Sequence, residues 1–372
     1  MRVLLVSNGY GEDLMGAVLG RALRDRGAEV AAYPLVGTGH AYAAEAIPTL
    51  DPRRTLPTAG FGFRTGVRAA WQDLRAGWLS LTVAQRRTLR AQRGRCDLVV
   101  AVGDVFCLWM ASAAGPRGVV YVPTAKSEYN DPHRLFELAL VRRLARLSFP
   151  RDQLTTDRFR GAGLAAEFVG NLMMDCLEFS GDTFDLPPDV PTILLLPGSR
   201  SDAPHNFASL CRTAQAVACQ RPEVCFLVAL SPTVDVAALA RASGATVDGQ
   251  WLGFPGMRVR WTRKFADALA RAWVVVGMAG TAHEQAAGLG KPVVAYPGGG
   301  VQFTAKFLHM QARLLSDALV PVRAPEQAAE WVLRLIDDPE ERRRRGRVGQ
   351  ERMGPPGAAS RMADRLLARG GR

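Results

Sequence analysis

Residues 274–296 read VVVGMAGTAHEQAAGLGKPVVAY, and this stretch decides the fold class. Two apolar runs, at 274–277 and 292–296, flank a short helix-like segment that opens after Gly280. A continuous apolar run is typical of a strand buried on both faces, and strands that alternate with helices favour a parallel sheet. The stretch therefore predicts a strand–helix–strand unit of an α/β protein.

The same alternation extends along the rest of the chain. A first series of strands is expected at RVLLVS (2–7), AEVAAYPLV (28–36), DLVVAVG (97–103) and GVVYVP (118–123). A second series is expected at TILLLPGSR (192–200), VCFLVALS (224–231), RVRW (258–261), WVVVG (273–277) and PVVAY (292–296). Two such series predict two doubly wound, Rossmann-like domains.

The segment GDTFDLPPDVP (181–191) separates the two series and shows neither a helical nor a strand period. Its proline and aspartate content is typical of a linker. We predict an N-terminal domain over 1–180 and a C-terminal domain over 190–350. The last helix, 358–372, follows the breaker GPPG and could pack back on either half, the N-terminal domain included.

The composition narrows the functional classes. No uninterrupted apolar run reaches 18 residues, which argues against a spanning helix, and the first run, at 2–7, is too short for a signal peptide. The six cysteines form no CxxC pair, which argues against a zinc site and fits a reducing cytoplasm. The net charge of +12 favours anionic partners: nucleic acid, acidic lipids or phosphorylated substrates.

Residues 61–93 combine tryptophan with many arginines. A helix here would place Trp71 and Trp78 near one face, with Arg75 among the arginines around it. Tryptophan and arginine around an apolar stripe suit the membrane–water interface. The alternative is a helix that faces the core and has a solvated arginine face. Both interpretations stay open.

Three strand-to-helix turns contain glycine, and such turns bind ligands at the carboxyl edge of a parallel sheet. The first, SNGYGEDLMGA (7–17), lacks the third glycine of a dinucleotide fingerprint, because Leu14 stands there. Gly11 permits a tight backbone. Asp13 could cap the helix, or either Asp13 or Glu12 could bind sugar hydroxyls or act as a base.

The second turn is LLLPGSR (194–200). Gly198 and Ser199 offer backbone N–H groups there, and Arg200 can bind phosphate in a bidentate manner. A plain loop is the alternative.

The third turn is the opening stretch. Gly280 and Thr281 stand at a helix N-terminus, where free N–H groups attract phosphate. Glu284 can accept hydrogen bonds from ribose hydroxyls, and His283 could donate to phosphate or cap the turn. GGGVQFTAKF (298–307) predicts a mobile loop, whose candidate ligand contacts are Gly299, Gln302 and Lys306. The second and third turns together predict a nucleotide-diphosphate pocket.

Four segments, in order, resemble the GT-B glycosyltransferases, most closely lipid-A-disaccharide synthase and its relatives. They are DLMGA (13–17), FVGNLMMD (168–175), LLLPGSR (194–200) and GTAHEQAAGLGKPVVAY (280–296). The resemblance implies parallel sheets that face a central cleft, with a UDP-sugar held by the C-terminal domain without a metal or other cofactor. It also implies an acceptor on the N-terminal domain and inversion at the anomeric carbon.

The resemblance also implies roles for individual residues. Arg200 would contact the diphosphate, Gly280 and Thr281 would seat phosphate, and Glu284 would hold the ribose. Thr262 and Phe265 lie where such enzymes hold uracil.

An inverting transfer also needs a base that deprotonates the acceptor hydroxyl. Asp104 is our first choice because it ends a buried strand and the family has an aspartate in a similar place. Asp13 is the reserve. The alternative for Asp104 is a cap on helix 106–114.

The segment expected to border the acceptor differs from the corresponding segment of the family. TAKSEYNDPHRLFE (124–137) replaces an aromatic proline–tryptophan motif, and Lys126 and Glu128 are candidate acceptor contacts. The basic segment 61–93 favours a lipid-linked acceptor and an enzyme on the cytoplasmic face of the plasma membrane. We expect no nucleic-acid partner, and a homodimer is left open.

Two alternatives remain. One is a UDP-N-acetylglucosamine 2-epimerase on the same fold, although the acid and base residues outside the donor turns look sparse for it. The other is a non-catalytic protein that binds anionic membranes or nucleic acid, which the net charge favours and the donor turns argue against.

Overall fold

The computed structural model describes residues 1–55, 71, 75–115, 118–300 and 303–370. The chain divides into two compact units, Met1–Cys176 with Pro355–Arg372, and Leu177–Gly354. We call them the first and the second unit. The segment 181–191 belongs to the second unit instead of linking the two, because Phe184 is buried there and its carbonyl accepts a hydrogen bond from Arg260.

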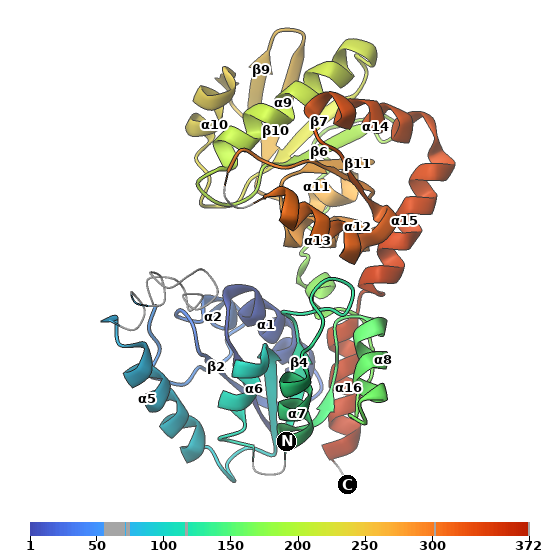
Figure 1. The fold of residues 1–372 in the computed structure, drawn as a ribbon. Coiled ribbons are helices and arrows are strands. Elements are labelled where there is room, and N and C mark those ends of the chain that lie inside the picture. The colour runs from blue at the N-terminus through green and yellow to red at the C-terminus, as the bar shows by residue number, and fades with distance from the viewer. Residues whose placement is uncertain (56–70, 72–74, 116–117, 301–302, 371–372) are drawn as a thin grey trace. The chain divides into compact units, whose positions relative to one another are not determined.

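The first unit is built on a five-stranded parallel sheet of order β2-β1-β3-β4-β5. Figure 1 labels two of its strands, β2 and β4. Its strands are β1 (Arg2–Ser7), β2 (Glu29–Pro34), β3 (Leu98–Gly103), β4 (Val119–Pro123) and β5 (Ala145–Ser148). Its helices are α1 (Tyr10–Arg24), α2 (His40–Ala44), α5 (Trp78–Ala91), α6 (Val105–Ala111), α7 (Leu135–Leu144), α8 (Gln153–Gly161) and α16 (Ala358–Gly370), with a 3-10 turn, η1, at Leu172–Cys176. Every residue of β3 and β4 is buried, which explains their unbroken apolar sequences.

The C-terminal helix α16 packs on α1 within the first unit. Asp175 fixes its start, since its two carboxylate oxygens accept hydrogen bonds from Gly357 N (2.5 Å) and Ala359 N (2.6 Å). A carboxylate at this place satisfies N–H groups that have no partner within the helix.

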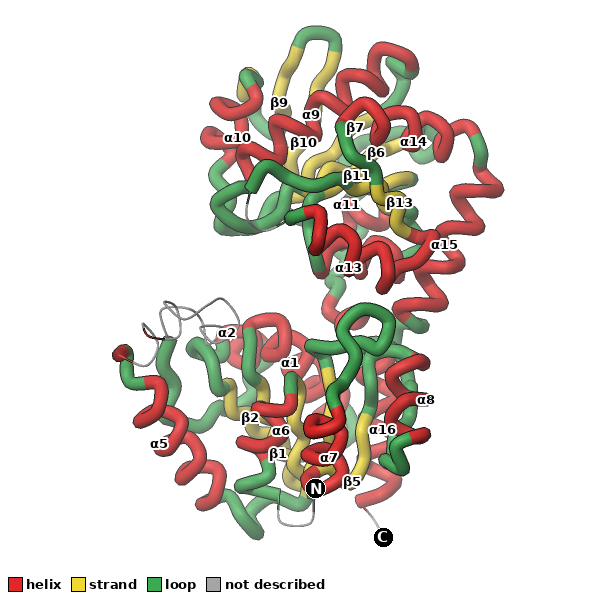
Figure 2. Tube along the Cα trace, in the orientation of Figure 1, coloured by secondary structure: helices red, strands yellow, loops and turns green. Residues whose placement is uncertain are grey.

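The second unit has an eight-stranded sheet of order β13-β12-β11-β6-β7-β10-β9-β8. The strands are β6 (Thr192–Leu196), β7 (Cys225–Ala229), β8 (Thr246–Asp248), β9 (Trp251–Phe254), β10 (Met257–Thr262), β11 (Val274–Gly277), β12 (Val293–Ala295) and β13 (Leu319–Pro321). The helices are α9 (Ala203–Gln220), α10 (Val236–Ser243), α11 (Phe265–Arg271), α12 (Thr281–Gly288), α13 (Ala305–Leu315), α14 (Pro325–Asp337) and α15 (Pro339–Met353). Figure 2 shows the strands of each unit as an inner layer among helices.

The antiparallel strands β8 and β9 were not expected from the sequence. They extend the sheet beyond β10, and every residue of β8 is exposed. An exposed edge strand needs no apolar run, so the signal that identifies the buried strands is missing there.

The helix α15 packs closely on α12 through two glycines, Gly346 and Gly349. A methyl group on Gly346 would run into the carbonyl oxygen of Gly290, and one on Gly349 into that of Ala287. The arginine-rich helix α15 thus packs against α12 at Gly349 and against the turn that follows α12 at Gly346.

The helix α5 occupies part of the predicted helix 61–93, of which 61–70 and 72–74 lie outside the described residues. Leu81 and Leu89 are buried in the first unit, and Trp78 stacks on Phe106 with ring centroids 6.2 Å apart. Trp71 is 56% exposed, and the Arg75 guanidinium lies 5.2 Å from its ring. The segment thus combines a core-facing side with exposed aromatic and basic groups. Among the described helices, none is long and apolar enough to cross a bilayer.

Candidate functional site

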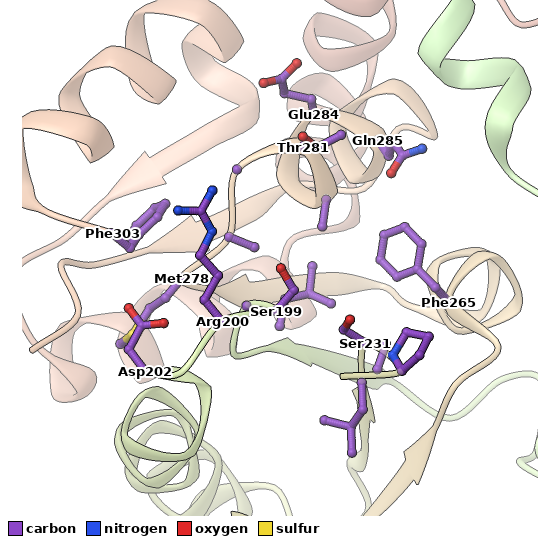
Figure 3. Close-up of a pocket in the computed structure, with 18 of the residues that line it drawn as sticks. Ser199, Arg200, Asp202, Ser231, Phe265, Met278, Thr281, Glu284, Gln285 and Phe303 are labelled. Carbon is purple, nitrogen blue, oxygen red and sulfur yellow. The ribbon is translucent and has the colours of Figure 1, made fainter. Parts of the chain in front are cut away.

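A cavity of about 630 Å³ lies in the second unit, where β6, β7 and β11 reach their carboxyl ends. The register brings these ends together, since Gly277 pairs with Leu196, and Leu195 with Val228. Seven of the predicted donor contacts line the cavity: Gly198, Ser199, Arg200, Phe265, Gly280, Thr281 and Glu284. Three separate turns thus meet at one site (Figure 3).

The helix α12 begins at the edge of this cavity. Its N-terminal flanking residue, Gly280, provides no side-chain cap, and Thr281 is its first residue. The first N–H groups of a helix have no partner within the helix and carry a partial positive charge. This end of the cavity is therefore suited to an anion.

Glu284 is fixed one turn further along α12. It is only 8% exposed, and its Oε1 atom accepts a hydrogen bond of 3.2 Å from Gln311 of α13. A carboxylate held in this way keeps one position and can still accept further hydrogen bonds. Glu284 lines the cavity, and its role as the ribose ligand stays a prediction.

The prediction that His283 donates to phosphate is wrong. Its side chain is fully buried, and its Nε2 atom accepts a hydrogen bond of 3.4 Å from Ala279 N. Burial lowers the pKa of His283 to about 3, so the ring is neutral at physiological pH. His283 packs edge-on against Phe303 and supports the turn, which is the capping alternative.

Four other predicted donor residues do not line the cavity or cannot be placed. Thr262 is buried, and its hydroxyl accepts a hydrogen bond of 3.0 Å from Lys264 N. Gly299 and Lys306 are absent from the cavity lining, and Gln302 lies outside the described residues. Of the two residues predicted to contact uracil, Phe265 lines the cavity and Thr262 does not.

Close packing accounts for the three glycines at 298–300, where the sequence predicts a mobile loop. A methyl group on Gly298 would come within 2.6 Å of Asn206 Oδ1, and one on Gly300 within 2.5 Å of Asp202 Oδ2. At Gly299 it would run into the ring of His205. Glycine thus lets this backbone lie against the first turn of α9.

Sequence reasoning missed several polar and aromatic groups of the cavity. Asp202 follows Arg200 by two residues, and Phe303 lies beyond the glycines. Arg263 at the end of β10 donates a hydrogen bond of 2.6 Å to Ser231 O, which ties together two loops of the cavity rim. In the sequence these three residues are marked only by their positions, each shortly after a strand or a glycine motif.

The first unit places Asp104 at the carboxyl end of β3, as the N-cap of α6. Its Oδ1 atom accepts hydrogen bonds from Phe106 N (3.0 Å), Cys107 N (3.1 Å) and Asn8 Nδ2 (2.7 Å). Asp104 therefore caps α6 through Oδ1, as the alternative interpretation predicts. All three bonds end on Oδ1, so capping does not occupy Oδ2.

Asp13 does not cap α1, since Gly9 is the N-cap and Asp13 lies inside the helix. Its side chain accepts a hydrogen bond of 2.6 Å from Ser7 Oγ, which lies 2.8 Å from the Tyr42 hydroxyl. At 2% exposure it does not face a ligand, which contradicts its role as the reserve base. Glu12, the neighbour of Asp13, is more accessible and accepts a hydrogen bond of 3.1 Å from Thr124 Oγ1. Burial raises the pKa of Asp13 to about 7.

This buried carboxyl makes stability depend on pH. Because its pKa in the folded state, about 7, exceeds the ordinary aspartate value of 3.8, the folded state binds one more proton than the unfolded state between these pH values. The stabilisation is fully present below pH 3.8 and is lost as the pH rises through 7. We expect Asp13→Asn to remove this dependence, which amounts to a few kcal/mol. Urea unfolding of wild type and variant at pH 5 and pH 8 measures it; an equal difference at both pH values would contradict it.

The acceptor candidates Lys126 and Glu128 are engaged within their own loop. Lys126 Nζ lies 2.9 Å from Glu137 Oε2, and Glu128 Oε1 accepts a hydrogen bond from His133 N and lies 2.8 Å from its Nδ1 atom. These contacts hold the loop at the carboxyl edge of the sheet. Gly11 lies in the first turn of α1, and a methyl group there would meet nothing within 4 Å.

No cluster of three or more histidine, cysteine or acidic side chains in the described part of the chain has the arrangement of a metal site. The polar side chains that line the cavity are those of two arginines, two carboxylates, three hydroxyl residues and one glutamine.

Comparison with known proteins identifies the fold. Over its whole length the chain is similar to the UDP-GlcNAc 2-epimerase from Neisseria meningitidis bound to UDP-GlcNAc, with a TM-score of 0.68 and 15% identity, covering 99% of this chain and 100% of that one. It is also similar to CalG4, the calicheamicin glycosyltransferase, with a TM-score of 0.67 and 19% identity, covering 100% and 98% of the two chains. The chain has the GT-B fold.

The sequence comparison agrees with the resemblance seen in the motifs. The chain is 26% identical to lipid-A-disaccharide synthase from Azoarcus sp. (strain BH72) over 310 residues, which cover 79% of this chain and 73% of that protein. No protein-family model matches. The predicted GT-B fold and the resemblance to lipid-A-disaccharide synthase are confirmed, and the chain is glycosyltransferase-like. Since a 2-epimerase has the same fold, the fold alone does not choose the reaction.

Proposed function

We propose that this protein is an inverting, metal-independent glycosyltransferase that moves a hexose or N-acetylhexosamine from a UDP-sugar to a lipid-linked acceptor. The observation that carries the proposal is the cavity of the second unit, which combines the start of α12 with Arg200, Glu284 and Phe265. The supporting comparison is lipid-A-disaccharide synthase, together with a neighbouring structure bound to UDP-GlcNAc.

The cavity offers complementary groups for each part of a sugar nucleotide. In Figure 3, Phe265 and Ser231 lie at one end, and Ser199, Arg200 and Thr281 lie nearer the middle. An aromatic ring suits a base, and a guanidinium beside a helix N-terminus suits a diphosphate. Glu284 accepts hydrogen bonds from the vicinal ribose hydroxyls.

The proposed reaction needs one proton acceptor and a stabilised leaving group. The acceptor oxygen attacks the anomeric carbon while the bond from that carbon to UDP breaks, and UDP departs with the electron pair. Asp104 takes the hydroxyl proton on Oδ2. Arg200 and the N-terminal N–H groups of α12 stabilise the negative charge that grows on the diphosphate.

Calorimetric titration with UDP tests the donor site. We expect Glu284→Ala to weaken UDP binding by about 1–3 kcal/mol, because it removes hydrogen bonds from ribose hydroxyls to a carboxylate. Glu330→Ala, on the exposed face of α14, serves as the control and should bind UDP as wild type does. Equal affinity in all three proteins would remove Glu284 as the ribose ligand. Absence of UDP binding to wild type would overturn the proposed function.

The exposed groups near α5 support the proposed site of action, the cytoplasmic face of the plasma membrane. Trp71, Leu79 and Val83 are each at least 50% exposed, and the Arg86 guanidinium lies 3.9 Å from the ring of Trp109. Aromatic and aliphatic groups among arginines bind an anionic bilayer surface through burial and charge together.

A double variant tests this surface. Trp71→Ala with Leu79→Ala is expected to lower binding to vesicles that contain phosphatidylserine about 10-fold or more, because it removes two apolar anchors. Flotation of the protein with the vesicles measures it. Val247→Ala, 52% exposed on β8, serves as the control. If the double variant floats with the vesicles as wild type does, Trp71 and Leu79 do not bind the membrane.

The second candidate is a UDP-N-acetylglucosamine 2-epimerase, because proteins with that activity share the whole-chain fold. The two functions differ in their need for an acceptor. Incubation with UDP-N-acetylglucosamine alone, followed by NMR, distinguishes them. Formation of the manno epimer without any acceptor would favour the epimerase and contradict the transferase.

A further inference from the structure

The end of the cavity opposite Phe265 is lined by Asp202, Met278 and Phe303 (Figure 3). Asp202 directly precedes α9 but makes no capping hydrogen bond to that helix. An aspartate at a helix start usually accepts one from the first turn. The position of this carboxylate therefore needs another explanation.

Two acceptor atoms at the start of α9 are buried and have no hydrogen-bond partner among the described residues. They are Oδ2 of Asp202 and Oδ1 of Asn206. Asn206 is 1% exposed, and its Nδ2 atom donates a hydrogen bond of 3.0 Å to Pro197 O, which fixes the orientation of the amide. Buried acceptors without partners are costly and rare. Asp202 lines the cavity and Asn206 does not, so a ligand in the cavity could supply donors to the carboxylate of Asp202 only.

Gly300 lies directly against Asp202. A methyl group on Gly300 would come within 2.5 Å of Oδ2 and 2.7 Å of the Asp202 Cβ. Gly300 does not have a positive φ, so alanine could adopt its backbone conformation. The close contact with Asp202 thus gives a reason for glycine here.

The chemistry of a carboxylate limits what it can bind. Ionised aspartate only accepts hydrogen bonds, and it repels a phosphate. The part of a ligand beside Asp202 must therefore carry hydroxyl or N–H donors. A nucleotide with its base near Phe265 and its diphosphate near Arg200 would bring its sugar to this end of the cavity.

We propose that Asp202 is a specificity-determining residue whose carboxylate accepts hydrogen bonds from hydroxyl groups of the transferred sugar. This inference rests on the proposed function, since it takes the cavity to bind a sugar nucleotide. It assigns the cavity a second acidic contact besides Glu284, directed at the sugar of the donor and not at the ribose.

Calorimetry with UDP, UDP-glucose and UDP-N-acetylglucosamine tests the assignment. For Asp202→Asn we expect the ratio of the Kd for a UDP-sugar to the Kd for UDP to rise about 10-fold or more, because hydrogen bonds to a charged acceptor are lost. The affinity for UDP itself should be equal to that of wild type or higher, since a negative charge near the diphosphate is removed. Gly300→Ala keeps the carboxylate but displaces it, and should raise the same ratio.

Two control variants match the two changes. Asp248→Asn lies on the exposed strand β8, and Gly161→Ala, at the end of α8, has nothing within 4 Å of the added methyl group. Both should leave the ratio unchanged. A wild-type ratio in Asp202→Asn, with UDP binding intact, would overturn the role of Asp202 alone. A wild-type protein that binds neither UDP nor the UDP-sugars would overturn the proposed function itself.

Discussion

Asp104→Asn is expected to lower glycosyl transfer about 10²–10⁴-fold while leaving the affinity for UDP unchanged. Asparagine keeps an oxygen at the Oδ1 position, so the hydrogen bonds from Phe106 N, Cys107 N and Asn8 can remain. It loses the ionised oxygen that would take the proton of the acceptor hydroxyl. The cavity proposed for UDP lies in the other unit, so the two measurements separate catalysis from donor binding.

The comparison needs a control aspartate in the same unit. Asp25→Asn, at the exposed end of α1, should transfer sugar at the wild-type rate. Thermal melting and circular dichroism show whether Asp104→Asn is folded. A folded Asp104→Asn protein with full activity would exclude Asp104 as the base, and Glu12 would be the carboxylate to test next.

Gly349→Ala is expected to destabilise the second unit by about 1–3 kcal/mol and to weaken UDP binding. Alanine usually stabilises a helix relative to glycine by up to about 1 kcal/mol, so the expected sign is opposite to that of intrinsic propensity. The reason is the contact with α12, because a methyl group on Gly349 would run into the carbonyl of Ala287, and backbone cannot rotate away as a side chain can. Movement of α12 would also displace Thr281 and Glu284 from the cavity.

Denaturant unfolding and calorimetry with UDP measure the two effects. Gly161→Ala is the matched control, since that glycine is also helical but its added methyl group has open space. It should leave both UDP binding and the stability of the second unit at their wild-type values. A Gly349→Ala protein that is as stable as wild type and binds UDP equally well would show that the α12–α15 contact adapts without cost.

The buried strands were predictable because their apolar runs are long and uninterrupted. All residues of β3, β4, β6 and β11 are buried, and each falls in a segment that the sequence marks as a strand. The strands β8 and β9 were missed because that signal is absent from them: every residue of the edge strand β8 is exposed, and only Leu252 of β9 is buried. Hydrophobic periodicity reports burial, and it says little where a strand lies at a solvated edge.

The cavity residues were predictable where a motif places them, and not where packing decides. Arg200, Thr281 and Glu284 stand at fixed offsets from strand ends, so topology alone brings them to one edge of the sheet. His283 has the same kind of offset, yet its side chain points into the core. One residue further along a helix turns a side chain by about 100°, and sequence spacing does not tell which direction faces the ligand.

The sequence by itself determined the two α/β series, the turns that carry glycine and charge, and the resemblance to lipid-A-disaccharide synthase. These features depend on local composition and on chain order, which can be seen without coordinates. Only the tertiary structure decided that Asp13 and His283 are buried, that three glycines lie against α9, and that Asp202 lines the cavity. Each of these depends on contacts between segments distant in the chain, and such contacts form only when the sheet and its helices pack.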